Sequence, residues 1–300
     1  FTVGIYDAWF GYQSYYSGAR LAGYLLIFVF LIILITKYFG DNSSSVAIKS
    51  SELINKVQLS KSKQIILTSL CILIFTTVFC LPLFQLILWQ LSDSSISLLS
   101  SSYLFVNSLI LGISAAAFTI FIAIALSLSY RQSNKFKSFI TISTSGYAIP
   151  GSVISAGLLI GFDAIFNTSI TLYGIYGLIA CLGLRFMTPA FNYLSASLAN
   201  ISSSSEKALS LISTNQAKAF TSFYFPQMKP ALSLSFMIVF IESIKEQPAT
   251  LLLRPVGFDT LSTKIFNYTS EGQWGLAASP SLLLIIPVSY THLTLPTTIA

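Results

Sequence analysis

The stretch QIILTSLCILIFTTVFCLPLFQLILWQL at residues 64–91 decides the fold, because it contains no charged side chain. A helix needs about 20 mostly apolar residues to cross the hydrocarbon core of a bilayer. The whole chain follows the same bias. Of its 300 residues, 54% are hydrophobic and 9% are charged, whereas soluble proteins carry roughly 25% charged residues. Such a composition suits a surface that contacts lipid, so the sequence predicts a membrane protein.

Six further segments are apolar enough, or nearly so, to cross a membrane. They are expected at about residues 21–36, 103–130, 139–160, 171–190, 231–253 and 276–288. The predicted fold class is therefore an all-α polytopic membrane protein with about seven transmembrane helices. Prolines inside these segments, such as Pro82 and Pro150, are tolerated in membrane bundles.

The distribution of positive charge predicts how these spans are oriented. When the loops are assigned alternately to the two sides, only Arg20, Arg254 and Lys264 fall on one of them. The other side, which includes Arg131 and Arg185, is then expected to be cytoplasmic. The net charge of +6 is spread over single side chains between apolar runs, so nucleic acid is not expected as a partner.

A Ser- and Lys-rich segment at residues 39–63 is expected to be a cytoplasmic linker. Residues 1–38 would then be the end of one half of a duplicated protein with its last transmembrane helix, and residues 64–288 a second half of six helices. Such duplication suits a transporter built from two halves. The chain lacks an initial Met and a signal pattern, so we expect a fragment. The run SYTHLTLPTTIA at residues 289–300 resembles a translated sequencing adapter and is expected to be a non-native tail.

The longest expected cytoplasmic stretch, residues 192–230, reads NYLSASLANISSSSEKALSLISTNQAKAFTSFYFPQMKP. The Ser-rich run ending at Ser205 offers an N-cap, and Glu206 falls in the first turn of a short amphipathic helix. A second helical stretch at residues 216–225 is expected to end at Pro226, because proline lacks the backbone N–H that would continue it.

This short helix, bend and proline before a span resemble the cytoplasmic loop of ATP-binding-cassette (ABC) importer permeases. In that family the loop docks on the ATPase subunit. The matching residues are Glu206, Lys207, Ala208, Phe225, Pro226 and Pro230. The family's glycine is replaced by Ile212 if the alignment is anchored on Glu206, or by Ser213 if it is anchored on Pro226. The alternative interpretation of this segment is an ordinary amphipathic helix at the membrane interface.

A second resemblance lies in FIESIKEQPATLLLRPVGFDTLSTKIF at residues 240–266, which is similar to a stretch of ferric-iron importer permeases. The runs FTVGIYDAWFG at residues 1–11 and SGYAIPGSVI at residues 145–154 also resemble that family. The resemblance implies a multi-pass permease in the bacterial inner membrane that imports ferric iron delivered by a periplasmic solute-binding protein.

The same resemblance implies that the chain is a transport subunit, not an enzyme, and that it binds no cofactor. ATP and magnesium would be bound by a separate ABC ATPase, because this sequence carries no phosphate-binding loop. The alternatives are an ABC permease for thiamine, sulfate, phosphate or polyamine, or an ion-coupled secondary transporter that uses Glu242 and Glu246.

A group of charges falls within the predicted span at residues 231–253. Glu242 and Lys245 are spaced i,i+3 and can pair on one helical face, while Glu246 lies next to Lys245. Pro248 is expected to bend or end the helix, with Arg254 near the outer interface. The group is interpreted either as a structural ion pair or as carboxylates that line an ion path; a misplaced span that leaves the charges at an interface is the third possibility. No metal site is predicted.

Overall fold

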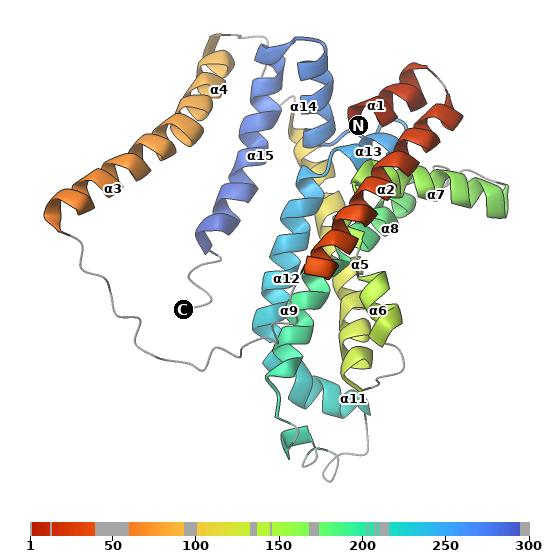
Figure 1. The fold of residues 1–300 in the computed structure, drawn as a ribbon. Coiled ribbons are helices and arrows are strands. Elements are labelled where there is room, and N and C mark those ends of the chain that lie inside the picture. Colours follow the sequence, from red (N-terminus) through yellow and green to blue (C-terminus); the bar gives the residue numbers. More distant parts are fainter. Residues whose placement is uncertain are drawn as a thin grey trace.

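The computed structural model describes residues 2–12, 14–39, 60–92, 101–132, 137–144, 146–167, 174–202, 204–206, 209 and 216–294. Within these ranges the regular structure is entirely helical (Figure 1). The α-helices are α1 (Thr2–Tyr6), α2 (Tyr15–Phe39), α3 (Lys61–Phe75), α4 (Leu81–Ser92), α5 (Ser102–Gln132), α6 (Lys137–Ser143), α7 (Gly151–Phe166), α8 (Ile175–Arg185), α9 (Met187–Ala199), α11 (Gln216–Ala219), α12 (Phe225–Lys245), α13 (Pro248–Leu253), α14 (Leu261–Ser270) and α15 (Trp274–Thr294). Three π-helical segments join neighbouring helices, namely η1 (Asp7–Gly11), η2 (Thr76–Cys80) and η6 (Phe220–Tyr224), and η4 (Gly146–Ala148) is a short 3₁₀ turn.

Three continuous helical runs are long and apolar enough to cross a membrane: Lys61–Ser92, Ser102–Arg131 and Phe220–Lys245. A fourth span is formed if α8 and α9, which meet at an angle of 52°, are counted as one bent helix. Three shorter apolar helices lie within α2, α7 and α15. The chain is therefore an all-α polytopic membrane protein, as the sequence predicted.

The core of the bundle lies where α5, α9 and α12 pack on one another. Ala115, Ala116 and Ala123 of α5 are fully buried there, and small side chains of this kind allow helices in a membrane to approach closely. Gly112 has the same role, since a Cβ at this position would lie 2.8 Å from Ile244 Cγ1 of α12. Helices α5 and α12 therefore pack closely at Gly112.

The helical run α3–η2–α4 has no buried residue and packs through α4 on α15 (Figure 1). It contains the apolar sequence on which the membrane prediction was based. An apolar helical run without a buried residue is stable in lipid, where no water contacts its side chains.

The structure corrects the bounds of several predicted spans. The segment at residues 139–160 is divided into α6, η4 and α7, and α7 lies across the bundle (Figure 1). Gly146 contacts the backbone of Leu184 so closely that no side chain would fit, and Pro150 is the N-cap of α7. These two residues break the helix because the chain turns there against α8.

The ends of the predicted linker and of the last span also differ. Helix α2 continues to Phe39 and α3 begins at Lys61, so Lys61 and Lys63 are helical, while residues 40–59 lie outside the described ranges. Helix α15 runs beyond residue 288 to Thr294, because no proline or glycine follows Pro287 before Pro296.

The segment at residues 1–38 packs against the rest of the chain. Ile5 of α1 and Ala22 of α2 are buried in one apolar cluster with Val153 and Ala156 of α7 and Leu252 of α13. The end of the expected first half thus contacts the expected second half directly.

Candidate functional site

The segment expected to dock an ATPase is held by one arginine at the end of α5. Arg131 donates through Nε to Glu206 Oε1 at 2.7 Å and through Nη2 to the carbonyl of Ile201 at 2.7 Å. Its Nη1 donates to the carbonyl of Leu198, in the last turn of α9. Arg131 therefore ties the end of α9 and the segment that follows it to α5.

Glu206 also joins this segment to the helix on its other side. The hydroxyl of Tyr224, in η6, donates to the same Oε1 at 3.0 Å. The hydrogen bond from Arg131 lowers the pKa of Glu206 below its ordinary value, against the opposing effect of partial burial, and the Tyr224 bond lowers it further. The carboxylate is therefore ionised at neutral pH and connects α5, α9 and η6.

The predicted short helix begins in the serine run. Ser202 Oγ accepts a hydrogen bond from the backbone N–H of Ser205 at 3.2 Å, so the N-cap is Ser202. Residues 204–206 are helical, which confirms the helix start ahead of Glu206. The other residues of the predicted loop motif, Lys207, Ala208, Ile212 and Ser213, lie outside the described ranges.

The expectation that a helix ends at Pro226 is wrong. Residues 216–245 form one uninterrupted helical run through α11, η6 and α12, although α11 runs across the lower end of α12 (Figure 1). In the wider π-helical turn, the N–H of Phe225 bonds to the carbonyl of Phe220. This geometry accommodates the proline ring at the start of α12 without a break. Phe225, Pro226 and Pro230 are all exposed.

The charged group in the membrane-spanning part consists of two separate ion pairs. The predicted i,i+3 pair is present, with Lys245 Nζ 2.8 Å from Glu242 Oε1. Glu246 pairs instead with Arg185, whose Nη1 is 3.2 Å from Glu246 Oε1. The side chain of Glu246 is only 7% exposed.

The partner of Glu246 places Arg185 in the helical bundle. Arg185, which the loop count assigned to the cytoplasmic side, is the last residue of α8, at the bend of 52° between α8 and α9. Glu246 likewise follows α12 at a break before α13, and its carboxylate accepts from the N–H of Ala249 at 3.3 Å. The ion pair thus joins the break between α8 and α9 to the break between α12 and α13. Gly151 abuts both side chains so closely that a Cβ would collide with them.

Helix α12 ends at Lys245, just before Pro248, as predicted, and Pro248 is the first residue of α13 after the break. Arg254 follows α13 and pairs with Asp259, a partner that the sequence did not indicate. Its Nη1 also lies 3.3 Å from Thr263 Oγ1 of α14. Thr260 forms a capping box with Thr263 at the start of α14. Arg254 therefore fixes the turn that connects α13 to α14.

The described residues contain no group of three or more His, Cys, Asp or Glu side chains that could hold a metal ion. The carboxylates of Glu242 and Glu246 are instead paired with cations.

The sequence matches no family model. It is 27% identical over 225 residues to an Fe(3+)-transport system permease protein of Haemophilus influenzae, which covers 71% of this chain and 44% of the relative. It is 33% identical over 127 residues to a ferric transport system permease protein of Actinobacillus pleuropneumoniae, which covers 40% of this chain and 18% of the relative. The chain thus spans less than half the length of these curated relatives.

These matches agree with the helices, which give a multi-pass membrane protein. They confirm the predicted resemblance: the chain is a relative of the permease proteins of ferric transport systems.

Proposed function

We propose that the chain is the membrane-spanning permease of an ABC importer that moves ferric iron into the cytoplasm. The observation that carries this proposal is the similarity to an Fe(3+)-transport permease over 71% of the chain. The relatives do not favour a permease for thiamine, sulfate, phosphate or polyamine, nor a secondary transporter. The chain would lie in the bacterial inner membrane and receive iron from a periplasmic binding protein.

The segment at residues 206–230 is proposed to dock the ATPase subunit, which would bind ATP and magnesium. Two features of the contacts support this role. The Arg131–Glu206–Tyr224 cluster connects the segment to α5, α9 and the start of the helical run that contains α12. A movement of the docked ATPase would therefore displace helices of the bundle core. Phe225 is 45% exposed beside it and offers an apolar contact to a partner.

The charges in the bundle are proposed to act as structural ion pairs. Glu246 and Arg185 join two broken helices, and each neutralises a charge that would be costly in a membrane. Glu242 is likewise paired with Lys245. A carboxylate that bound the transported ion would have to release its cation first, so the pairing favours the structural interpretation over a carboxylate-lined path.

The substrate is tested by deleting the gene and measuring uptake of ferric iron, thiamine, sulfate, phosphate and a polyamine in parallel. We expect a loss of ferric iron uptake alone, restored by the wild-type gene. Normal iron uptake with loss of one of the other solutes would refute the iron assignment but leave a permease. Uptake that is unchanged for all of them would refute the transport function.

A further inference from the structure

The end of α5 that holds the docking segment also lines a cavity of about 430 Å³. This volume lies in the range of roughly 300–1,000 Å³ that is typical of ligand sites. The cavity lies between the ends of α5 and α9 and the first residue of α6. Figure 1 shows these ends of α5 and α9 at the same end of the bundle as α11. Three helices therefore form a space that is large enough for a small ligand.

Two cationic side chains line this cavity, Arg131 of α5 and Lys137 of α6. The Nζ of Lys137 lies 5.3 Å from the ring centroid of Tyr130, and the attraction between ammonium and ring holds the charge beside the cavity. The described lining contains no carboxylate, because Glu206 pairs with Arg131 without lining the cavity. Such a lining favours an anion.

The guanidinium of Arg131 has donors left for an anion. It carries five N–H groups, and its bonds to Glu206, Leu198 and Ile201 use one N–H each of Nε, Nη1 and Nη2. These three bonds leave one N–H on Nη1 and one on Nη2. Arginine is the residue that most often presents such paired donors to phosphate oxygens. Arg131 can therefore bind a phosphate and still hold the docking segment.

The cavity lies at the depth of the lipid headgroups. The apolar run Ser102–Arg131, which is long enough to cross a membrane, ends at Arg131, with Tyr130 just before it. Tyrosine and basic side chains at the end of a span are typical of the membrane–water interface. Phosphate is the anionic group at this depth, and basic pockets between transmembrane helices bind lipid headgroups. Ala196 and Ala199 of α9 add apolar contact to the same lining.

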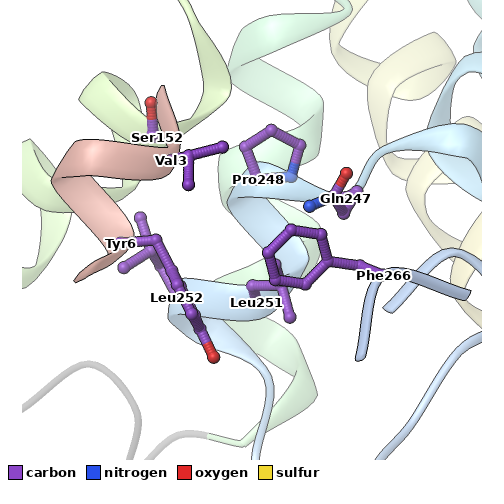
Figure 2. A pocket seen from close by; sticks show the side chains of 8 residues that line it. All are labelled: Val3, Tyr6, Ser152, Gln247, Pro248, Leu251, Leu252 and Phe266. Carbon is purple, nitrogen blue, oxygen red and sulfur yellow. The ribbon is translucent and has the colours of Figure 1, made fainter. Parts of the chain in front are cut away.

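Two other hollows in the described part of the chain lack this combination. A cavity of about 100 Å³ lies between α1, α7, α13 and α14, and its described lining includes Ser152 and Gln247 but no charged side chain (Figure 2). A hollow on α3 has one cation, Lys63, beside apolar side chains. Neither brings two cations together, so neither is expected to select an anionic lipid.

We propose that the cavity between α5, α6 and α9 binds the phosphate headgroup of an anionic phospholipid, with Arg131 and Lys137 as its cationic ligands. The inference goes beyond the proposed function, and only the choice of the cytoplasmic leaflet, which carries anionic lipids, rests on that function. The lipid phosphate and Glu206 contact the same guanidinium, so Arg131 connects the bilayer to the docking segment.

The test is native mass spectrometry of the complete permease, titrated in detergent with phosphatidylglycerol or with phosphatidylcholine of the same acyl chains. The wild-type protein should bind one phosphatidylglycerol more tightly than phosphatidylcholine. Lys137→Gln should weaken phosphatidylglycerol binding about fivefold, as expected for the loss of one cation near a membrane surface, and should leave phosphatidylcholine binding unchanged. Lys137→Arg keeps the charge and should restore the affinity. Lys137 is exposed, so both variants should fold.

A second variant tests the cavity itself. Ala196 is exposed and lines the cavity, so Ala196→Phe should place a ring in this space without changing any charge. It should weaken phosphatidylglycerol binding at least as much as Lys137→Gln does. This result separates a lipid held in the cavity from a general attraction to basic side chains. The matched control is Lys63→Gln, which removes an exposed cation from α3 and should leave the affinity unchanged.

Three results would overturn the lipid site. The first is equal weakening by Lys137→Gln and Lys63→Gln, and the second is unchanged binding in Ala196→Phe. The third is displacement of the lipid by inorganic phosphate but not by chloride at the same ionic strength, which would show a site for free phosphate. None of these measurements uses iron or the ATPase. Failure of the proposed iron import would therefore leave the lipid site standing, and failure of the lipid site would leave the import.

Discussion

Replacement of Arg131 by methionine should detach the docking segment, because the three hydrogen bonds of this guanidinium hold the segment in place. The side chains of Arg131 and Glu206 are 21% and 27% exposed, so their ion pair contributes about 1 kcal/mol, at the upper end for exposed pairs. The bonds to the carbonyls of Leu198 and Ile201 add about 1 kcal/mol each. The ordered conformation would thus lose about 3 kcal/mol, which is roughly a hundredfold in an equilibrium constant.

The assay is the affinity of the purified ATPase subunit for the permease in nanodiscs. If the segment must adopt this conformation to bind, Arg131→Met should weaken the affinity by up to about a hundredfold. Arg20→Met is the matched control, since Arg20 contacts Tyr16 and Tyr24 near the start of α2, away from the docking segment. Wild-type affinity in a folded Arg131→Met variant would refute the reasoning.

Three further predictions follow from the contacts. Because the pKa of Glu206 is lowered, the stabilisation that its carboxylate gives the segment is complete above the ordinary carboxyl pKa and is lost as the pH falls through the lowered pKa. The rate of hydrogen exchange in the segment should therefore rise only under acid conditions. A Glu206→Gln variant that retained this pH dependence would contradict the assignment. Gly112→Ala should destabilise the bundle by about 1–3 kcal/mol through collision with α12, and an unchanged melting temperature would show that the helices are not so close. Glu246→Leu should lower the free energy of unfolding by about 3–5 kcal/mol, because it leaves the charge of Arg185 unpaired. Adding Arg185→Met should restore much of this loss. A double variant that is no more stable than the single variant would argue against the ion pair.

The membrane fold could be predicted because it depends on the length and composition of apolar segments. Residues 64–91 need no tertiary partner to be recognised as a span, and the helical run containing them indeed has no buried residue. The Glu242–Lys245 pair and the break at Pro248 were also predictable, since each depends on neighbours within one helix.

Features that depend on contacts between distant segments could not be predicted. The bend at Phe186 lies between Gly183 and Pro189, which favour a break, but these residues do not indicate which side chain Arg185 meets in the bundle. The ion pair between Arg185 and Glu246 depends on this bend, and the pairing could not be predicted. The continuation of the helix through Pro226 depends on a π-helical turn, which the rules for α-helices do not anticipate.

The proposed import of ferric iron is tested most directly by radioactive iron uptake into vesicles that contain the permease, an ATPase subunit and the binding protein loaded with ferric iron. The account predicts uptake that requires ATP hydrolysis and persists when an uncoupler collapses the ion gradients. Uptake that stops with the uncoupler while ATP is held constant, or that proceeds without the ATPase subunit, would contradict it.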